Sequence, residues 1–459
     1  MKIETFNSPS KENTILIEDK LPEISFVPFQ AFKLNKADVV WVNGNLVRDL
    51  GLELSSIEND ILENYAYVSN GYTDVAKINF NDKKTFLADR YGSRYEVCNG
   101  GSARCGINGQ FQIKGIGVNP LVSNNIDEHH SHGKLCLSEA VNEAIWGELC
   151  HKYLPHGAIR TLAIIDTHTE VRSFYGLNDS RNLPCALAIR EASVRPAHFE
   201  RATFFLPEKG YEYLRDNDSE RVKKTISYLS SSFSPNYNDD NSRVENTYNS
   251  LVIFAERLAE QLAVSRIHGI PHGSLTSSNI SCDGRFVDFG TITAVPDFSN
   301  FILGSEQRGV WDDHYLIIEW LKYLVFYINK YSVKKISASE FNSLASQFST
   351  TLKLTENEEL SKILHLKVKN KTLQMIKDEL CSSGNLNREF DEITTPPLLN
   401  QIGKALSKYN IKHDISKINF PLRNKRYSQG FIINEIMKLT SGGCVKKERI
   451  SNFINSYTK

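Results

Sequence analysis

The first quarter of the chain alternates short apolar runs with Asn, Gly and Asp. Runs such as residues 37–42, 95–98 and 111–114 have the length of strands and are bounded by turn-forming residues. Between residues 24 and 116 this pattern predicts a sheet-rich region. The loop at residues 99–106 within it is rich in glycine, and its backbone amides are placed to approach an anion.

Helical spacing begins after Asn119-Pro120. In residues 138–153, Val141, Ile145 and Leu149 recur at helical intervals, and Ser138 stands where a helix N-cap is expected. The other predicted elements are buried strands at 157–166 and 186–189 and helices at 222–229, 251–266 and 313–331.

A strand-rich first part followed by a helix-rich second part predicts an α+β fold with two lobes and a cleft between them. The expected division is an N-terminal tail (1–24), a sheet-rich N-lobe that includes the helix bearing Glu143 (25–185), a helical C-lobe (186–330) and a C-terminal helical region (331–459).

The balance of charge narrows the range of partners. Lys and Arg together number 54, as do Asp and Glu, so no general attraction to nucleic acid or to an anionic membrane surface arises, and neither is expected as a partner. No apolar run approaches the roughly 20 residues that cross a bilayer, and the polar N-terminus does not resemble a secretion signal. We therefore expect a cytoplasmic protein.

Two features that suggest metal binding have simpler interpretations. The eight cysteines include no Cys-x-x-Cys pair, so neither a zinc ribbon nor a redox motif is indicated. The acidic and histidine-rich run at residues 127–132 lies where a loop is expected, and we interpret it as solvated.

The most specific local pattern lies in residues 272–290. Asn279 precedes, and Asp288 follows, two short apolar stretches joined by Asp283-Gly284, a pair typical of β-hairpin turns with positive φ at both positions. Such a hairpin brings Asn279 and Asp288 to the same edge. Their amide and carboxylate oxygens suit Mg²⁺ held between protein and nucleotide phosphates, so the pattern predicts an ATP and Mg²⁺ site.

A catalytic loop, a hairpin and Asp-Phe-Gly follow one another in the same order in the protein-kinase fold. Upstream, a predicted strand ends in Lys114, where kinases place a phosphate-binding lysine that pairs with a helical glutamate, and Glu143 is the candidate partner. Alone, Lys114 and Glu143 would indicate a surface ion pair. Joined to the downstream pattern, they predict a two-lobed protein-kinase-like fold with its site near Lys114, Asn279 and Asp288.

From residue 25 to residue 330 the sequence resembles the selenoprotein O family, kinase-fold pseudokinases that transfer AMP to protein hydroxyls. The residues that carry the resemblance are the Lys-Gly-x-Gly-x-x-Pro run at 114–120, Gly133-Lys134 with the Glu-bearing helix, Arg190, Ala192 and Arg195 followed by Phe199-Glu200, and His272-Gly273 with Asn279 and Asp288-Phe289-Gly290.

The resemblance implies a nucleotide bound in the reverse sense to a kinase, with its α-phosphate toward the acceptor. Lys114, Arg190 and Arg195 would hold the outer phosphates, and Asn279 and Asp288 would coordinate Mg²⁺. The further positions assigned to the nucleotide are Gly101, Ser102, Arg104, Gly115 and Gly117. The implied activity is transfer of AMP from ATP to a protein or peptide hydroxyl, with release of pyrophosphate.

Two serines depart from these patterns. A kinase of this loop type carries its catalytic Asp at the position of Ser274, and the family's base stands at the position of Ser278. Ser278 joins Lys114 and Glu143 as a candidate catalytic position, but a serine hydroxyl has too little proton affinity to replace a carboxylate. The alternatives are an ATP-binding pseudokinase that acts as a scaffold or switch, and a phosphotransferase with an unusual base.

Overall fold

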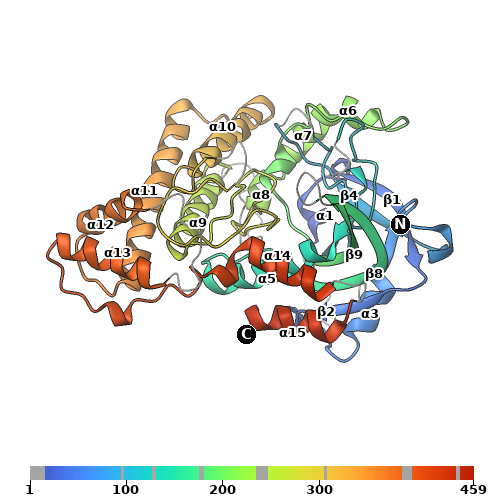
Figure 1. The fold of residues 1–459 in the computed structure, drawn as a ribbon. Helices are drawn as coiled ribbons and strands as arrows, with labels where there is room; N and C mark the ends of the chain where they lie inside the picture. The colour runs from blue at the N-terminus through green and yellow to red at the C-terminus, as the bar shows by residue number, and fades with distance from the viewer. Residues whose placement is uncertain are drawn as a thin grey trace.

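The structure is a computed structural model that describes residues 16–94, 98–126, 131–174, 180–233, 247–303, 308–384, 395–440 and 445–458. A sheet forms one side of the molecule, and most of the longer helices form the other (Figure 1). The predicted two-lobed α+β fold is confirmed.

The described strands form one nine-stranded antiparallel sheet in the order β2-β8-β9-β6-β5-β4-β1-β3, with β7 paired to β9. Their bounds are β1 Phe26–Leu34, β2 Asp38–Val42, β3 Tyr67–Ser69, β4 Ile78–Asp89, β5 Cys105–Asn108, β6 Phe111–Lys114, β7 Leu135–Cys136, β8 Thr161–Phe174 and β9 Ser180–Glu191.

Each face of the sheet packs against a separate core, because successive side chains of a strand point to opposite faces. In β9, Leu187 and Ile189 belong to the core shared with helices α2 (Gly44–Asp49) and α3 (Ile57–Tyr65). Ala186 and Ala188 belong to the other core, which contains helix α5 (Leu137–Tyr153).

The predicted boundary between the lobes at residue 185 falls inside a strand. Strand β9 runs through it from Ser180 to Glu191 and pairs with β6, β7 and β8 along its length. The apolar run at 186–189 is a strand as predicted, but nothing local in its sequence identifies the strands that it pairs with. The helical lobe therefore begins after this strand.

Helix α5 is the predicted helix of residues 138–153, and it begins at Leu137. Cys136 is the N-cap residue and not Ser138 as predicted, because Cys136 also ends strand β7 and the chain enters the helix directly from the sheet. Nearly every residue from Leu137 to Cys150 is buried, including Glu143 and Glu148. A helix buried on all sides must be covered by more than the sheet.

The helices between the sheet and the C-terminal region are short except for two. Their bounds are α6 Tyr213–Asp216, α7 Asp218–Ile226, α8 Leu229–Phe233, α9 Thr247–His268 and α10 His314–Tyr331. The helices predicted at 251–266 and 313–331 correspond to α9 and α10. The helix predicted at 222–229 is wrong as one unit, because α7 ends at Ile226 and α8 starts at Leu229.

The C-terminal region is helical, as predicted for residues 331–459. Its described helices are α11 Ala338–Ile363, α12 Asn370–Ser382, α13 Thr395–Lys408, α14 Gln429–Thr440 and α15 Lys447–Thr458. Helix α11 packs along α9, while α12 and α13 form a small separate core with α11 at the far end of the helical lobe (Figure 1).

Helices α14 and α15 return to the sheet and cover α5 (Figure 1). The Ser451 hydroxyl donates to the backbone oxygen of Val40 at 2.9 Å, and the Trp41 indole donates to Asn455 at 3.4 Å, so α15 is bonded to strand β2. The C-terminal helices thus supply the second wall around α5, and they belong to the N-lobe in space although they end the described chain.

The segment predicted as an N-terminal tail is packed from residue 17 onward. It forms the short helix α1 (Ile17–Lys20), and Ile17 and Leu21, one helical turn apart, are buried in the same core as α5. In the described ranges, no helix combines the length and the apolar composition that crossing a lipid bilayer requires.

The packing of α15 predicts that Ile454→Ala destabilises the protein. The Ile454 side chain is fully buried in the core that contains α5, so its truncation leaves a cavity and costs about 2 to 5 kcal/mol of unfolding free energy. Chemical denaturation of the full chain measures this loss. The exposed Asn452 on the same helix is the control, and Asn452→Ala is expected to stay within about 0.5 kcal/mol of wild type; equal effects of the two substitutions would contradict the packing.

Candidate functional site

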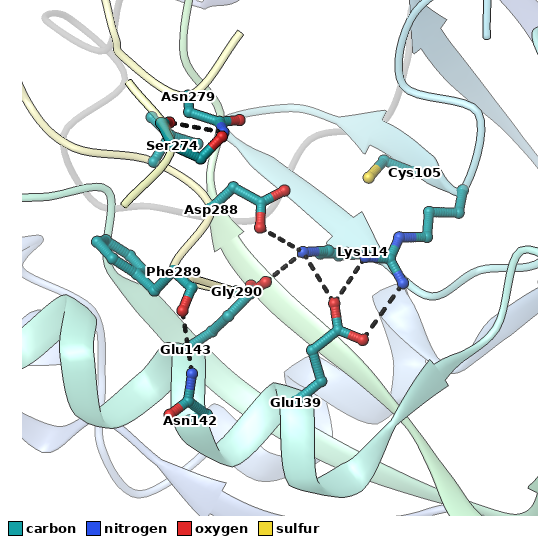
Figure 2. A network of polar contacts seen from close by, with 12 residues as sticks. Cys105, Lys114, Glu139, Asn142, Glu143, Ser274, Asn279, Asp288, Phe289 and Gly290 are labelled. Atoms are coloured by element: carbon teal, nitrogen blue, oxygen red, sulfur yellow. Dashed lines mark hydrogen bonds and ion pairs between the residues drawn. The ribbon is translucent and has the colours of Figure 1, made fainter. Parts of the chain in front are cut away.

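Lys114, the last residue of β6, is the centre of the candidate site. The strand places Phe111 and Ile113 in the core of one face, which leaves Lys114 on the face toward α5, where it is 1% exposed. Its Nζ contacts the Glu143 carboxylate, as expected from the sequence, and lies 3.3 Å from Asp288 Oδ1 (Figure 2). One buried ammonium therefore joins the sheet, helix α5 and the Asp-Phe-Gly segment.

Glu139 is a member of this cluster that the sequence analysis missed. Its Oε1 lies 3.4 Å from Lys114 Nζ (Figure 2). The same oxygen lies 2.6 Å from the guanidinium of Arg104, so Glu139 joins the glycine-rich loop to the lysine. The signal was available, because Glu139 stands four residues before Glu143 and residues four apart share one face of a helix.

The hairpin that carries Asn279 and Asp288 is shorter and of another type than predicted. Gly284 has φ of 89°, its amide donates to Ser281, and Ser281 in turn donates to Arg285. This is a type I turn followed by a left-handed glycine, and not a turn with positive φ at both central positions. The prediction that Asn279 and Asp288 meet at one edge is nevertheless correct, because Val287 N donates to the Asn279 carbonyl at 2.9 Å.

The Asp288 backbone is held in an uncommon conformation. Its φ is 62°, in the left-handed region that Asp enters more readily than most residues. The next residue, Phe289, is buried, and its carbonyl accepts a hydrogen bond of 3.1 Å from Asn142 of α5 (Figure 2). Because this contact fixes Phe289, the Asp288 carboxylate stays directed toward Lys114.

The charges around Asp288 keep it ionised. Burial alone would raise the pKa of this carboxyl, but Lys114 and three arginines outweigh burial and hold the pKa well below its usual range; the three are Arg190, Arg104 and Arg195. Burial likewise opposes the charge on Lys114, yet Asp288 and Glu143 raise its pKa above the ordinary lysine value. Acid and base therefore stabilise each other's charged forms.

Arg190 lies on β9 beside the cluster. Its guanidinium donates to Gln112 Oε1 at 2.7 and 3.0 Å, lies 3.6 Å from Glu143 and approaches the sulfur of Cys105 at 3.9 Å. Gln112 was not predicted, although it points to the same face of β6 as Lys114 two residues later. Burial raises the pKa of Cys105, so its thiol is not a reactive group.

Arg195 connects the site to the catalytic loop, the segment that carries Ser278 and Asn279. Its Nη1 donates to the backbone oxygen of Ser278 at 2.8 Å, and its guanidinium lies 5.4 Å from the ring centre of Tyr91. Its Nε is buried and has no hydrogen-bond partner among the residues that the structure describes. Both predicted arginines, Arg190 and Arg195, thus lie close enough to Asp288 for their charges to lower its pKa.

The glycines assigned to the nucleotide also have structural roles. Gly115 and Gly117 have φ of 93° and 101°, which favour glycine, and their amides donate to the carbonyls of Arg104 and Gly133. The amide of Ser102 donates to Asp89, and a Cβ on Gly101 would come within 2.2 Å of the same carbonyl. Their assignment to a nucleotide stays a prediction. The amides of Gly115, Gly117 and Ser102 already have hydrogen-bond partners, so at these positions the assignment depends on the shape of the backbone.

The two serines stand where the sequence placed them. Asn279 Nδ2 donates to the carbonyl and the hydroxyl of Ser274, at 3.0 and 3.2 Å, and the hydroxyls of Ser278 and Thr276 are 2.9 Å apart. No contact joins either serine hydroxyl to a carboxylate among the described residues. Residues 127–130 of the histidine-rich run lie outside the described ranges.

Asn279 and Asp288 fit a magnesium ion in the chemistry of their donor atoms. The amide nitrogen of Asn279 donates to Ser274, while its oxygen accepts only a long hydrogen bond of 3.5 Å from the Ser278 hydroxyl (Figure 2). The Asp288 side chain is 32% exposed. Two oxygens of this kind, beside water and phosphate oxygens, make up a typical magnesium environment. Elsewhere in the described ranges, no three His, Cys, Asp or Glu side chains gather as a metal site.

The charge cluster predicts a pH-dependent loss of stability in Lys114→Met. Removal of the cation leaves Glu143, Glu139 and Asp288 facing one another, and breaking a buried pair costs about 3 to 5 kcal/mol at pH 8. In wild type the lowered pKa of Asp288 keeps its contribution constant above pH 5. In the variant the lysine no longer lowers the pKa of Asp288 and Glu139, so folding becomes less favourable as the pH increases.

Thermal unfolding at pH 5 and pH 8 measures this effect, and the gap between wild type and variant is expected to be wider at pH 8. The control is Lys447→Met, which breaks an exposed ion pair with Glu58 and should cost no more than about 1 kcal/mol at either pH. If the difference in unfolding temperature between wild type and variant is the same at pH 5 and pH 8, the carboxylates do not repel one another.

Among the curated proteins that this chain resembles, three are each named "Protein nucleotidyltransferase YdiU". The protein of Synechocystis sp. is 23% identical over 62% of this chain and 56% of its own length. Those of Pectobacterium carotovorum subsp. carotovorum and Pectobacterium atrosepticum are 23% and 24% identical over 63% and 43% of this chain, and 56% and 36% of their own lengths. The chain spans about half the length of the curated relatives that it matches.

A family profile described as "Protein adenylyltransferase SelO" matches residues 19–320. The match covers more than half of the chain and includes every residue of the site, from Lys114 to the Asp-Phe-Gly segment at Asp288. It confirms the resemblance seen in the sequence. The chain therefore belongs to the SelO family.

Proposed function

We propose that this protein transfers AMP from ATP to a hydroxyl of a protein, in a magnesium-dependent reaction that releases pyrophosphate. The proposal is supported most directly by one observation: the ionised Asp288 carboxylate lies next to the Lys114–Glu143 pair and to Asn279 in a member of the SelO family. A carboxylate, an amide oxygen and a fixed cation are the groups that phosphate chemistry requires.

The roles proposed for the basic residues follow from their chemistry. Lys114, Arg190 and Arg195 hold the outer phosphates of ATP, where arginine's planar fork contacts phosphate oxygens in pairs. All three side chains are almost fully buried, so their charges act at short range with little screening by solvent. Glu143 keeps Lys114 in place through their ion pair.

Asn279 and Asp288 would hold Mg²⁺, which when bound neutralises phosphate charge and polarises the phosphorus toward attack. The backbone of Asp288 is fixed beforehand by the Asn142–Phe289 contact, so the carboxylate loses little freedom on binding. The protein's share in the reaction is positioning and charge stabilisation.

Two alternatives differ in the fate of ATP. A pseudokinase scaffold binds ATP without turnover, an interpretation that Ser278 invites but that membership of this family does not favour. A phosphotransferase moves the γ-phosphate. Neither the fold nor the charge cluster distinguishes these reactions, so the position of the transferred label decides among them.

The proposal predicts transfer from ATP labelled at the α-phosphate and none from ATP labelled at the γ-phosphate. The protein is incubated with Mg²⁺, labelled ATP and a cell extract as the source of acceptor proteins. The intact mass of a labelled acceptor shows a gain of one AMP unit. Asp288→Asn should lower the incorporation on the order of 10²-fold or more, because loss of a metal ligand removes several kcal/mol of stabilisation.

Asparagine suits the test because it tolerates the left-handed backbone of position 288. The exposed Asp74 provides the matched control, and Asp74→Asn should leave incorporation unchanged. Label from the γ-phosphate alone would replace the proposal with phosphotransfer, and no label from either position, with ATP still raising the unfolding temperature, would favour the scaffold.

A further inference from the structure

A cavity of about 230 Å³ opens beside the catalytic loop. Thr276, Ser277 and Ser278 line one side of it, Tyr323 of helix α10 lines another, and Glu200 belongs to its wall. A second cavity of about 200 Å³ shares Glu200 and Tyr323 with the first. The two cavities therefore meet at Glu200, next to the loop that carries Asn279.

Glu200 is held in this wall by its backbone. It directly follows the 3-10 turn η3 (Pro196–Phe199), which is bonded to the catalytic loop through Ala197 N and the Ser277 carbonyl at 3.1 Å. The backbone oxygen of Glu200 accepts a hydrogen bond from Arg221. Its side chain is only 2% exposed, and within the described residues its carboxylate forms no ion pair, while the Ser277 hydroxyl gives it only a poorly formed hydrogen bond.

Other buried acids of this protein have partners. Asp89 contacts Gln112 and His198, Asp218 contacts Arg201 and Arg221, and Glu356 contacts Arg266 and Lys377. A buried carboxyl without an ion-pair partner or a well-formed hydrogen bond is costly and calls for an explanation. Because Glu200 lines two cavities, the explanation that the geometry favours is a ligand that supplies the missing contact.

We propose that these cavities receive the acceptor's hydroxyl-bearing segment and that Glu200 takes the proton of that hydroxyl. The inference rests on the proposed AMP transfer. The acceptor oxygen forms a bond to the α-phosphorus, and the bond from that phosphorus to the bridging oxygen of the β-phosphate breaks, so its electron pair leaves with pyrophosphate. The acceptor's proton moves to the Glu200 carboxylate and passes from there to water.

The surroundings of Glu200 suit a proton acceptor at neutral pH. Burial raises the pKa of Glu200 to about 7, while Ser277, Arg94 and Arg221 offset part of that rise. The other ionisable groups that face it are Tyr327 and Glu319 of helix α10 and Arg201. A base whose pKa lies near the working pH combines a large ionised fraction with useful proton affinity.

The test is Glu200→Gln, which keeps the shape of the side chain and removes its basicity. The rate of AMP incorporation from α-labelled ATP should fall by about 10²- to 10⁴-fold. In wild type the rate should rise from pH 6 to pH 8 as Glu200 loses its proton, and this rise should be absent in the variant. ATP with Mg²⁺ should raise the unfolding temperature of both proteins, since the nucleotide site is intact.

Ser278 lines the same cavity, so Ser278→Asp places a carboxylate toward the same space. Added to Glu200→Gln, it should restore part of the lost rate, which a merely structural role of Glu200 would not allow. Glu208→Gln is the matched control, because Glu208 is exposed and lies outside both cavities. It should leave the rate and the pH profile unchanged.

A second measurement does not depend on turnover. An acid whose pKa is raised on folding weakens the fold as the pH rises through 7, so Glu200→Gln should unfold at a higher temperature than wild type at pH 8 but not at pH 5. A wild-type rate and pH profile in Glu200→Gln would overturn the inference, as would equal unfolding temperatures at pH 8.

The two proposals fail in different ways. If wild type transfers only the γ-label, the proposal of AMP transfer is refuted but the role of Glu200 is not. Loss of γ-label transfer in Glu200→Gln would then still support Glu200 as the base. If the α-label is incorporated and Glu200→Gln does not slow its incorporation, only the role of Glu200 as the base is refuted. Absence of any label from wild type refutes both.

Discussion

The site depends on one positive charge that water scarcely reaches. Lys114 is desolvated at the end of a strand, and carboxylates from helix α5 and from the segment after the hairpin compensate it. Such a cluster is stable only as a whole, since each member left unpaired in a buried setting is costly. The three elements that meet at Lys114 are therefore tied to one relative position, and the proposed nucleotide site requires that position.

Helix α5 carries this constraint to the rest of the molecule. It brings Glu139 and Glu143 to the lysine and Asn142 to the carbonyl of Phe289, so one face of a single helix sets the charge cluster and the direction of Asp288. The sheet covers it on one side and helices α14 and α15 on another. Gln429 at the start of α14 also donates to the Gly290 carbonyl, so the C-terminal helices contact the Asp-Phe-Gly segment directly.

The sequence was sufficient for those parts of the site that lie in local patterns. The spacing of Asn279 and Asp288 around a turn, and a lysine at a strand end, are visible in short segments. Glu139, Gln112 and Glu200 were not given roles because their importance depends on what faces them from other elements, although residue spacing placed the first two on the right faces. The lobe boundary expected at residue 185 falls inside β9 for the same reason, since pairing of β9 with the sheet is a non-local property.

The return of the C-terminal helices to the sheet has a consequence for biosynthesis. On the ribosome, strand β2 and helix α5 emerge long before α14 and α15, which cover them in the finished structure. Until residues 429–458 have been made, the outer face of α5 lacks its apolar cover, and the lysine cluster lacks its full shielding from water. A nascent chain therefore passes through a long interval in which all residues of the charge cluster exist but the helices that cover α5 do not.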